Sequence, residues 1–350
     1  MASIAIIGTG WGSRVQVPMF REAGLDIVGI AGFHGEKTRR IGEELVIPPF
    51  DDWRALLDTE ADIISITAPP SEHLEMATAA LESGKHVINE KPTALNAAEA
   101  SRLLSVSRRH SSRISLVDHE LRFLPAWRAA KEQIERIGPL RYVEVRYASP
   151  GRGDRTREWN WWSDAGRGGG IWGAVGSHFV DTIRYLGFEI DAAKADLRTI
   201  IAERPFGNSR RAVTSDDYAV VNLQLRGGAL AAISLSAVAS GTDEPAMITI
   251  HGEDGAFRLL GEELLHAKPS KPFVRIAGGD LQKMPGNSPG GAFGTGTLLF
   301  GRALRAALDD NHRAELNPAA TFDDGLAQQK VLDAARQSAN QNGVWVKVAR

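Results

Sequence analysis

Lysine and histidine are the residue types in this chain best suited to move a proton or to stabilise a developing charge. Lys91 stands in the run Glu90-Lys91-Pro92, directly after the apolar segment His86–Asn89. An ammonium at the end of a buried strand could polarise a reacting oxygen or carry a proton to it. A surface Glu-Lys pair would have the same sequence, and the residues alone do not separate these two interpretations.

His178 is the second candidate for proton transfer. An unperturbed imidazole has a pKa near 6.5, so it can act as a general acid or base near neutral pH. The apolar neighbours Val175 and Phe179 suit a satisfied core histidine equally well. Asp181 follows three residues later and could either hold the imidazole or cap local structure.

A glycine-rich turn supplies a candidate binding site for a dinucleotide. The run Gly8-Thr9-Gly10-Trp11-Gly12-Ser13 follows the predicted strand Ser3–Ile7 and opens the predicted helix Arg14–Gly24. Gly8 would permit the tight turn, and Gly10 would let the backbone approach a pyrophosphate at the helix N-terminus. The fingerprint has glycine or alanine where this chain has Ser13, and a glycine-rich turn without a ligand is the alternative.

The end of the second predicted strand, Asp26–Ala31, bears on the choice of nicotinamide cofactor. NAD sites usually have a carboxylate there for the ribose 2′-hydroxyl, but Asp26 begins the strand. The strand is followed by Gly32-Phe33-His34 and by three cations, Lys37, Arg39 and Arg40. This pattern favours NADP(H) over NAD(H), although a solvated helix face would also account for the cations.

These residues require a parallel sheet to position them. Apolar segments alternate with helical patterns in the first third of the chain, which predicts a doubly wound α/β Rossmann domain over residues 1–120. The predicted strands are Ser3–Ile7, Asp26–Ala31, Ala61–Thr67, His86–Asn89 and Ile114–Asp118. The predicted helices are Arg14–Gly24, Glu36–Leu45, Asp52–Asp58, Ser71–Ser83 and Asn96–Arg109.

Residues 121–350 show a different pattern, which predicts an α+β domain with an antiparallel sheet. After a helix at Pro125–Ile137, alternating strands are predicted at Leu140–Tyr147, Ala219–Leu225, Ala229–Val238, Met247–His251 and Ala256–Leu260. Hairpin turns are expected at 226–228 and 253–255. Two helices, Gly294–Leu308 and Thr321–Gln341, and a strand at Val344–Val348 close the chain, and Lys268–Gly291 is expected to be a long loop.

Composition excludes several classes of function. The chain has 350 residues, 41 Lys and Arg, 43 Asp and Glu, and no cysteine. This balance gives no sign of a nucleic-acid or membrane surface, and thiol chemistry and Cys-ligated metals are excluded. We find no histidine or carboxylate spacing typical of a metal site, no signal peptide and no membrane span, so we expect a cytoplasmic protein without a metal.

The motifs taken together resemble the Gfo/Idh/MocA oxidoreductase family over nearly the whole chain. They are the glycine turn, Thr67-Ala68-Pro69-Pro70-Ser71-Glu72-His73, Glu90-Lys91-Pro92, Gly168-Gly169-Gly170, Gly176-Ser177-His178-Phe179-Val180-Asp181 and the segment 321–338. The resemblance implies a Rossmann domain plus a C-terminal domain with a large open, mostly antiparallel sheet, which forms a homodimer or homotetramer. It also implies NAD(P)-dependent hydride transfer at a sugar, cyclitol or related polyol carbon.

The resemblance also implies roles for the candidate residues. Lys91 matches the lysine that polarises the reacting oxygen, and His178 matches the catalytic acid or base. Many members carry an aspartate four residues before this histidine, where this chain has Ala174. An aspartate there would share a helix face with His178 and could orient it, whereas alanine cannot.

Other residues are predicted to line the cleft. The predicted cofactor contacts, besides the glycine turn, are Phe33, His34, Thr67, Pro69, His73, Glu90, Lys91 and Trp161. The predicted substrate contacts are His119, Arg122, Arg155, Trp161 and Asp181. Trp161 could stack on a sugar face or on nicotinamide, although a tryptophan is also a common core filler. His73 could equally be a polar residue at a helix start, and Arg155 a part of a solvated loop.

Two alternative functions remain open at this stage. One is a non-catalytic NAD(P)-binding regulator, for which the missing aspartate at Ala174 is the motive. The other is a cofactor-recycling sugar lyase or glycosidase, in which the hydride returns to the product and no reduced cofactor accumulates.

Overall fold

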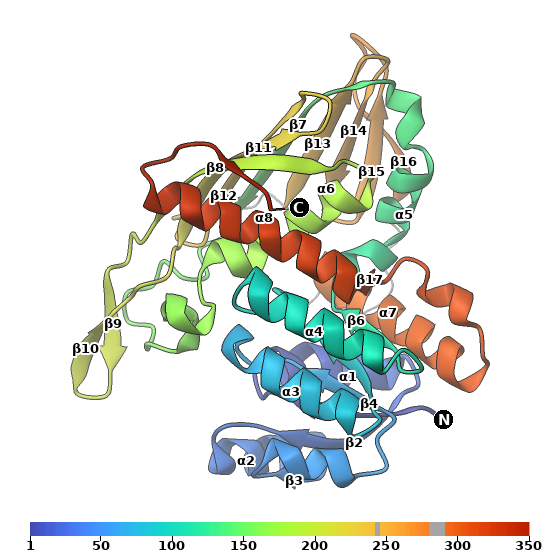
Figure 1. Cartoon of the computed structure of the whole chain (residues 1–350), viewed down its shortest axis with the longest axis vertical. Helices are drawn as coiled ribbons and strands as arrows, with labels where there is room; N and C mark the ends of the chain where they lie inside the picture. The colour runs from blue at the N-terminus through green and yellow to red at the C-terminus, as the bar shows by residue number, and fades with distance from the viewer. Residues whose placement is uncertain (242–245, 280–290, 350) are drawn as a thin grey trace. The chain divides into compact units, whose positions relative to one another are not determined.

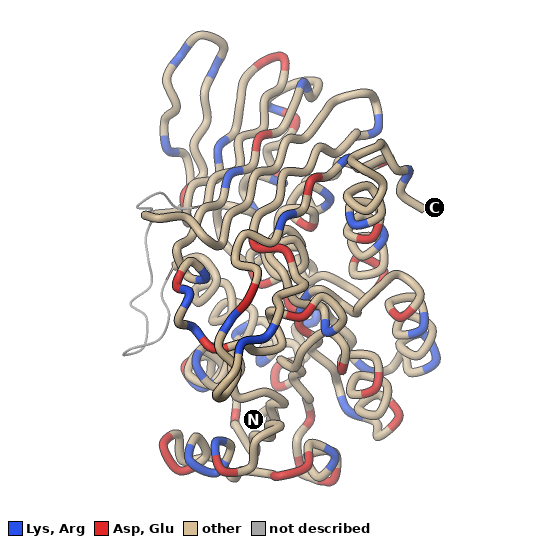
Figure 2. The backbone as a smooth tube through the Cα atoms, turned by 90° about the vertical axis from the view of Figure 1, so that its left-hand side faces the viewer, with Lys and Arg blue, Asp and Glu red and all other residues tan. Residues whose placement is uncertain are grey.

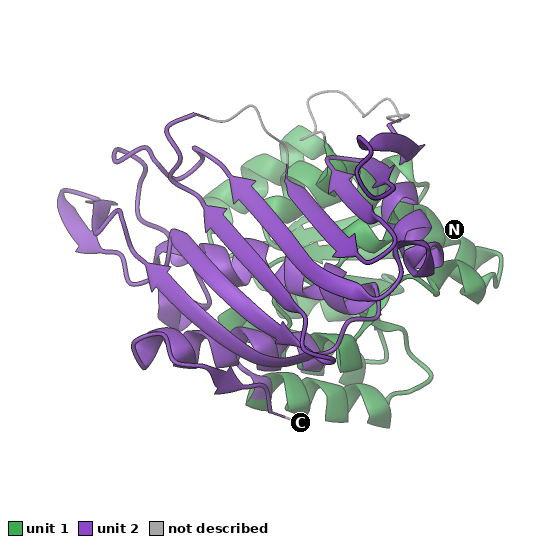
Figure 3. Cartoon of the chain, turned by 90° about the horizontal axis from the view of Figure 1, so that it is seen from above, with its two compact units in different colours: residues 1–94, 98–124, 281–326 green, residues 95–97, 125–280, 327–350 purple. Residues whose placement is uncertain are grey.

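The computed structural model of the chain describes residues 1–241, 246–279 and 291–349. These residues form two compact units (Figures 1 and 3). Unit 1 contains residues 1–94, 98–124 and the described part of 281–326. Unit 2 contains residues 95–97, the described part of 125–280, and 327–349.

Unit 1 is built on a 7-stranded sheet with the order β17-β6-β5-β4-β1-β2-β3. Its strands are β1 (Ser3–Ile7), β2 (Asp26–Ala31), β3 (Pro49–Phe50), β4 (Ile63–Ile66), β5 (His86–Asn89), β6 (Ser115–Val117) and β17 (Ala320–Thr321). All neighbours pair in parallel except β17, which is antiparallel to β6. The order reverses direction at β1, as in a doubly wound Rossmann sheet, which confirms the predicted fold of this part.

Both faces of this sheet are buried, which explains its continuous apolar strands. Ile4 and Ile6 of β1 belong to one core, whereas Ala5 and Ile7 belong to the other. The helices α1 (Val17–Glu22), α2 (Gly35–Leu45) and α7 (Ala292–Asp309) contribute to the first core. The helices α3 (Pro70–Glu82) and α4 (Ala97–Arg109) contribute to the second core.

Unit 2 contains a 9-stranded sheet with the order β16-β15-β14-β13-β7-β12-β11-β8-β18. Its strands are β7 (Leu140–Ala148), β8 (Ile190–Arg198), β11 (Tyr218–Leu225), β12 (Leu230–Ser236), β13 (Met247–Gly252), β14 (Ala256–Leu260), β15 (Glu263–Ala267), β16 (Val274–Gly278) and β18 (Val346–Lys347). Only the β7–β12 pair is parallel among the described strands of this sheet. This confirms the predicted large, mostly antiparallel sheet, and the two hairpin turns lie where they were expected.

The nine-stranded sheet has one buried and one exposed face. Along β12, Ala231, Ile233 and Leu235 are buried while the intervening residues are exposed. Figure 3 shows this sheet with its strands side by side. Helices of unit 2 are α5 (Pro125–Glu132), α6 (Ser177–Tyr185) and the larger part of α8 (Phe322–Asn340).

The structure contains strands that the sequence did not predict. Strand β8 reads Ile-Asp-Ala-Ala-Lys-Ala-Asp-Leu-Arg, and its alanines and charges have low strand propensity, so only pairing with β11 makes it a strand. The hairpin β9 (Glu203–Phe206) and β10 (Ser209–Ala212) and the strand β15 were also missed. Strand β16 lies within the expected loop Lys268–Gly291, and the 280–290 part of that loop is outside the described residues.

The boundary predicted after residue 120 remains a prediction about domains. The compact units divide the chain differently, because α7 and β17 belong to unit 1 although they follow most of unit 2 in sequence.

Lys and Arg residues are interspersed with Asp and Glu along the backbone (Figure 2). Within the described ranges, no helix is both long enough and apolar enough to cross a membrane.

Candidate functional site

The turn after β1 is shaped by two close backbone contacts. Gly8 has a φ of +129°, and a Cβ there would lie 2.1 Å from Thr67 Oγ1. A Cβ on Gly12 would lie 2.6 Å from the same oxygen, whereas a Cβ on Gly10 would meet nothing within 4 Å. Gly8 and Gly12 therefore allow β1 and β4 to pack at the turn, and Gly10 leaves open space above the backbone.

The helix after this turn does not begin as an α-helix. Gly12–Gln16 form a π-type turn, which continues into α1. Ser13 occupies the third glycine position of the fingerprint, and its buried hydroxyl donates to the carbonyl oxygens of Thr9 (3.1 Å) and Gly10 (3.3 Å). A serine therefore fits this position, because its hydroxyl binds the backbone of the preceding turn. Single π-turns are frequent at functional sites.

The end of β2 has carboxylates close by, although none belongs to β2 itself. A pocket of about 360 Å³ is lined there by Ile7, Gly32, Phe33, Asp51, Asp52, Trp53, Arg54, Glu72 and Glu75. Arg39 donates through one nitrogen to both oxygens of Asp51, at 2.9 and 3.0 Å. One of the cations that favoured NADP(H) is therefore already paired, and the connection that follows β3 supplies the carboxylate that β2 lacks.

Lys91 follows β5 at the carboxyl edge of the sheet and is surrounded by acids. Glu90, Asp118 and Glu120 are 8%, 1% and 2% exposed, while Lys91 is half-buried. The backbone N–H of Lys91 donates to Glu90 Oε2 at 3.2 Å. Gln16 Nε2 donates to Asp118 Oδ2 at 2.9 Å and lies 3.4 Å from Glu90 Oε1. We call Glu90, Asp118 and Glu120 the carboxyl cluster.

Burial raises the pKa of every carboxyl in this cluster. For Glu90 and Glu120 the neighbouring acids raise the pKa further, and the positive charge of Lys91 opposes the rise in all of them. For Asp118, the hydrogen bond from Gln16 also works against the rise in pKa. Gln16 Nε2 lies within 3.4 Å of an oxygen of both Glu90 and Asp118, so these two carboxyls are close neighbours. Closely spaced buried carboxyls favour keeping a proton.

His73 is not available to a cofactor, contrary to the prediction. Its imidazole is fully buried, with Nε2 2.9 Å from the carbonyl oxygen of Ala68 and Nδ1 3.1 Å from that of Pro92. Burial lowers the pKa of His73 to about 4, so the ring is neutral. His73 instead ties the start of α3 to the loop that carries Lys91. Thr67 and Pro69 lie in the same β4–α3 turn, and Pro69 is buried.

Arg122 is also engaged structurally. Its side chain is 6% exposed and its Nη1 lies 3.3 Å from Asp324 Oδ2 and 3.5 Å from the carbonyl oxygens of Pro318 and Ala319. The guanidinium therefore holds the segment before α8 within unit 1, and the predicted contact with substrate is not supported. His119 is 2% exposed and lies next to the carboxyl cluster in sequence.

In unit 2, His178 lies in the first turn of α6 and is 3% exposed. Asp181 is on the same helix and is equally buried. The preceding residues Trp172–Gly176, including Ala174, form a second π-type turn. Because a π-turn is wider than an α-helical turn, the predicted shared face of residues 174 and 178 holds only approximately.

The glycine run before this turn is explained by an aspartate that sequence reasoning missed. Gly170 has a φ of +112°, and a Cβ there would lie 2.4 Å from Asp216 Oδ1. Asp216 Oδ2 accepts from the backbone N–H of Trp172 at 2.7 Å, which anchors the start of the π-turn. Gln328 supports the next turn, because its Nε2 donates to the carbonyl oxygen of Ser177 at 2.7 Å.

The segment 159–162 contains three tryptophans, and all of them are half-buried. Arg152 stacks on Trp162 at 4.1 Å, and Arg211 stacks on Trp159 at 3.7 Å. Trp161 is half-buried, and Arg155 is exposed. The predicted roles of Trp161, Arg155, Asp181 and His119 in binding remain predictions.

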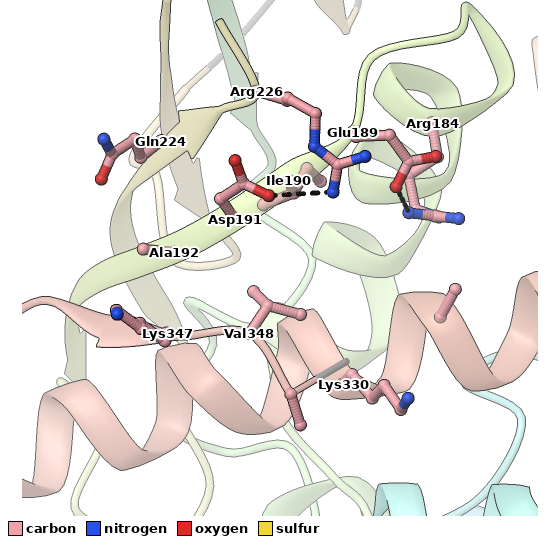
Figure 4. A pocket seen from close by; sticks show the side chains of 12 residues that line it. Arg184, Glu189, Ile190, Asp191, Ala192, Gln224, Arg226, Lys330, Lys347 and Val348 are labelled. Atoms are coloured by element: carbon pink, nitrogen blue, oxygen red, sulfur yellow. Dashed lines mark hydrogen bonds and ion pairs between the residues drawn. The ribbon is translucent and has the colours of Figure 1, made fainter. Parts of the chain in front are cut away.

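A pocket of about 450 Å³ in unit 2 is distinct from these residues (Figure 4). It lies between α8, β8 and β18, and two ion pairs, Arg184–Glu189 at 3.3 Å and Arg226–Asp191 at 3.1 Å, occupy part of its wall. None of the predicted site residues in the described chain lines it. Volume alone is therefore a poor guide to the site in this protein.

Gln16, Asp51, Asp118, Glu120 and Asp216 are the residues near the candidate sites that sequence reasoning did not assign. Only Asp118 and Glu120 had a signal, because Asp118 ends a predicted strand and Glu120 stands two residues after it. The others come from turns or from the interior of a helix, where single polar residues are common. Within the described residues, no group of three or more His, Cys, Asp or Glu is arranged to hold a metal ion.

Comparison with known proteins agrees with this architecture. Residues 2–118 match the model of the oxidoreductase family with an NAD-binding Rossmann fold, and residues 127–258 match the Gfo/Idh/MocA C-terminal domain. Glucose-fructose oxidoreductase domain-containing protein 2 of Xenopus tropicalis is 30% identical over 99% of this chain and 94% of its own length.

Two solved structures show the same fold at lower identity. Levoglucosan dehydrogenase in complex with NADH has a TM-score of 0.87 at 23% identity, covering 100% of this chain and 99% of its own. An inositol dehydrogenase homologue from Azotobacter vinelandii, complexed with NADH and myo-inositol, has a TM-score of 0.80 at 21% identity, covering 99% and 97%. With both domain models matched over most of its length, this chain belongs to the Gfo/Idh/MocA family of oxidoreductases with an NAD-binding Rossmann fold.

Proposed function

We propose that this chain transfers a hydride between a nicotinamide cofactor and a sugar, cyclitol or related polyol carbon. The observation that carries the proposal is the arrangement of unit 1. The glycine turn and Lys91 both lie at the carboxyl edge of one parallel sheet, after β1 and β5. Ligands of such sheets bind at this edge. The solved relatives with bound levoglucosan or myo-inositol support the substrate class.

The residues of the glycine turn fit a dinucleotide. Gly10 has open space above its Cα, and no side chain of the described residues caps the start of the helical segment, where backbone N–H groups could bind a pyrophosphate. The remaining predicted cofactor contacts would be Thr9, Trp11, Phe33, His34 and Trp161. When bound, a nicotinamide accepts or donates the hydride, and the protein supplies binding, orientation and proton transfer.

Lys91 polarises the reacting oxygen in this proposal. Its side chain is partly exposed and its charge acts on the neighbouring carboxyl cluster, so it can also act on an oxygen bound at the sheet edge. As an alcohol is oxidised, its O–H proton must leave as the hydride leaves carbon. In the reverse direction an alkoxide must be protonated. A neutral amine or imidazole can take the proton in oxidation, and an ammonium or imidazolium can return it in reduction.

Replacing His178 by alanine is expected to lower kcat by about 10²- to 10⁴-fold, the usual contribution of a general acid or base. NADH affinity should stay within a few-fold of wild type, because His178 belongs to a different unit from the glycine turn. Steady-state kinetics and fluorescence titration with NADH measure the two effects. His178→Gln, which keeps a polar side chain, controls for packing, and wild-type turnover in either variant would remove the histidine from the mechanism.

We also propose that the cofactor preference lies with NAD(H), in revision of the expectation from the sequence. Asp51 holds Arg39 and places a carboxylate next to Phe33 in the pocket at the end of β2. A ribose 2′-phosphate there would meet like charge, whereas a 2′-hydroxyl could donate to a carboxylate. The NADH-bound solved relatives support the same choice.

Asp51→Asn is therefore expected to move the Kd ratio of NADPH to NADH by about fivefold to tenfold toward NADPH. The size follows from about 1 kcal/mol of repulsion between exposed like charges 4 Å apart. Fluorescence titration with both cofactors measures the ratio. The double variant Asp51→Asn with Arg39→Ala should keep the gain, because the removed repulsion, and not the released guanidinium, is its source. An unchanged ratio in Asp51→Asn would contradict this assignment.

A homodimer or homotetramer remains our prediction for the assembly. One face of the nine-stranded sheet exposes Tyr142, Val220 and Leu230. These apolar side chains belong to three neighbouring strands of one sheet, β7, β12 and β11, so they form a surface that a second copy could cover. Sedimentation velocity on the purified chain measures the state.

The activity itself is tested with purified protein, NADH, NADPH and a panel of sugars, polyols and their oxidised forms. Cofactor binding together with turnover of a panel member would support the proposal. Binding without any turnover would favour a regulator, and turnover without net NAD(P)H formation would favour a recycling lyase or glycosidase. Binding of neither cofactor would refute the whole functional assignment.

A further inference from the structure

The carboxyl cluster is unusual because its members lie together in the interior, where Lys91 is the cation, among the described residues, whose charge acts on all three. Glu90 and Asp118 directly follow the neighbouring parallel strands β5 and β6, which pair up to Asn89 and Val117. Both carboxyls are therefore brought together by the sheet register. Glu120 begins the next turn and packs against α7, where a Cβ on Gly296 would lie 3.1 Å from Glu120 Cγ.

Full ionisation of this cluster is physically unfavourable. Three carboxylates and one ammonium would leave a net charge of −2 in a region from which water is largely excluded. Buried groups avoid such charge by keeping a proton. Asp118 Oδ1 is buried and finds no hydrogen-bond partner among the described residues, so no donor stabilises a negative charge on that oxygen.

The remaining neighbours do not supply more positive charge. Gln16 comes from the π-type turn, and its orientation is set because Ser65 Oγ donates to its Oε1 at 2.6 Å. It can therefore only donate to the acids through Nε2. His119 adjoins Asp118, and Arg122 is directed to Asp324. In the described part of unit 1, Lys91 is thus the cation whose charge acts on all members of the cluster.

We propose that Glu90, Asp118 and Glu120 form a proton store for Lys91, holding both protonated and ionised carboxyls at neutral pH. In alcohol oxidation, the Lys91 ammonium first passes a proton to a carboxylate of the cluster, where an O–H bond forms. The resulting Lys91 amine then accepts the proton of the substrate O–H as that bond breaks, and a bound oxidised nicotinamide would accept the hydride from carbon. Reduction runs through the same steps in reverse, and Gln16 holds the ionised acid in either direction.

The store is tested first in protein without cofactor. Infrared spectroscopy should detect the C=O stretch of a protonated buried carboxyl at pH 7. Glu90→Gln or Asp118→Asn should remove or shift this band, and the exposed Asp26→Asn at the other end of the sheet should leave it unchanged. Absence of any protonated carboxyl band at pH 7, or a band unaffected by both cluster variants, would overturn the proposal.

Folding stability gives a second measurement. A carboxyl whose pKa is raised by folding binds more protons in the folded state than in the unfolded state. Its contribution to the free energy of unfolding is complete below the pKa of the unfolded state, near 4. This contribution is lost as the pH rises toward and through the pKa of the folded state. We therefore expect wild-type stability to fall over this range. Glu120→Gln should flatten this dependence, and an unchanged slope in Glu120→Gln would remove Glu120 from the store.

The role in turnover rests on the proposed function and is measured separately. Asp118→Asn should shift one limb of the pH profile of kcat by about one unit or more, a tenfold change in rate at fixed pH. An active enzyme with no protonated carboxyl or no pH shift would overturn the store alone. A protonated cluster in a protein without any turnover would instead overturn the dehydrogenase assignment.

Discussion

Replacing Lys91 by methionine is expected to lower kcat by about 10²- to 10⁴-fold while leaving NADH affinity within a few-fold of wild type. Methionine keeps the length of the side chain but can neither polarise an oxygen nor carry a proton. It also removes the cation that offsets the buried charge of Glu90, Asp118 and Glu120. The acids should therefore bind their protons more tightly, and stability at pH 8 should fall by about 1–2 kcal/mol.

Lys91→Arg separates the catalytic role of Lys91 from its structural role. Arginine keeps the positive charge but is not deprotonated in proteins, so it cannot pass a proton. We expect Lys91→Arg to recover most of the stability lost in the methionine variant and little of the turnover. Chemical denaturation at pH 6 and pH 8 and steady-state kinetics measure the two effects. Turnover at the wild-type rate in Lys91→Met would exclude the lysine from catalysis.

Gly8→Ala is expected to destabilise unit 1 by about 3 kcal/mol or more. Its φ of +129° lies outside the range of alanine, and the new Cβ would overlap Thr67 Oγ1 and the Thr67 carbonyl oxygen, at 2.1 and 2.7 Å. Neither partner can move freely, because Thr67 N–H and Oγ1 both donate to the carbonyl oxygen of Ile7, at 2.7 and 2.9 Å. Denaturant titration of the purified variant measures the loss.

Gly10→Ala is the matched variant in the same turn. A Cβ there meets nothing within 4 Å, so stability should change by no more than about 0.5 kcal/mol. The added methyl nevertheless occupies the space over the backbone through which a pyrophosphate would pass, and we expect NADH affinity to fall about tenfold or more. A Gly10→Ala protein that binds NADH as wild type does would place the cofactor elsewhere, and a stable Gly8→Ala protein would refute the steric argument.

Each unit has a π-type turn close in sequence to its candidate residues. Gly12–Gln16 follow the glycine turn in unit 1, and Trp172–Gly176 precede His178 in unit 2. In the first, the turn carries Gln16 to Glu90 and Asp118. In the second, Asp216 holds the N–H of Trp172. The first turn therefore positions an amide next to carboxyls with a proposed role in proton transfer, and the second directly precedes His178 in sequence.

The sequence by itself determined the order of elements, the Rossmann class of unit 1 and the alternating sheet of unit 2. These features follow from local patterns, because a strand buried on both faces is continuously apolar and a strand buried on one face alternates. The glycine turn, Lys91 and His178 were also recognised from local sequence, because each belongs to a short motif of characteristic residues. Strand β8 was missed because its residues have no strand preference of their own.

Only the tertiary structure decided which polar residues meet. Asp51 reaches Arg39 from a different βα connection, and Gln16 reaches Asp118 across 102 positions of sequence. His73 and Arg122 were taken for binding residues, yet packing buries them against backbone carbonyls and, for Arg122, Asp324. The physical reason is that burial and charge depend on neighbours in space. The raised pKa of Glu90 and the pairing of Arg39 with Asp51 therefore arise only when folding brings these neighbours together.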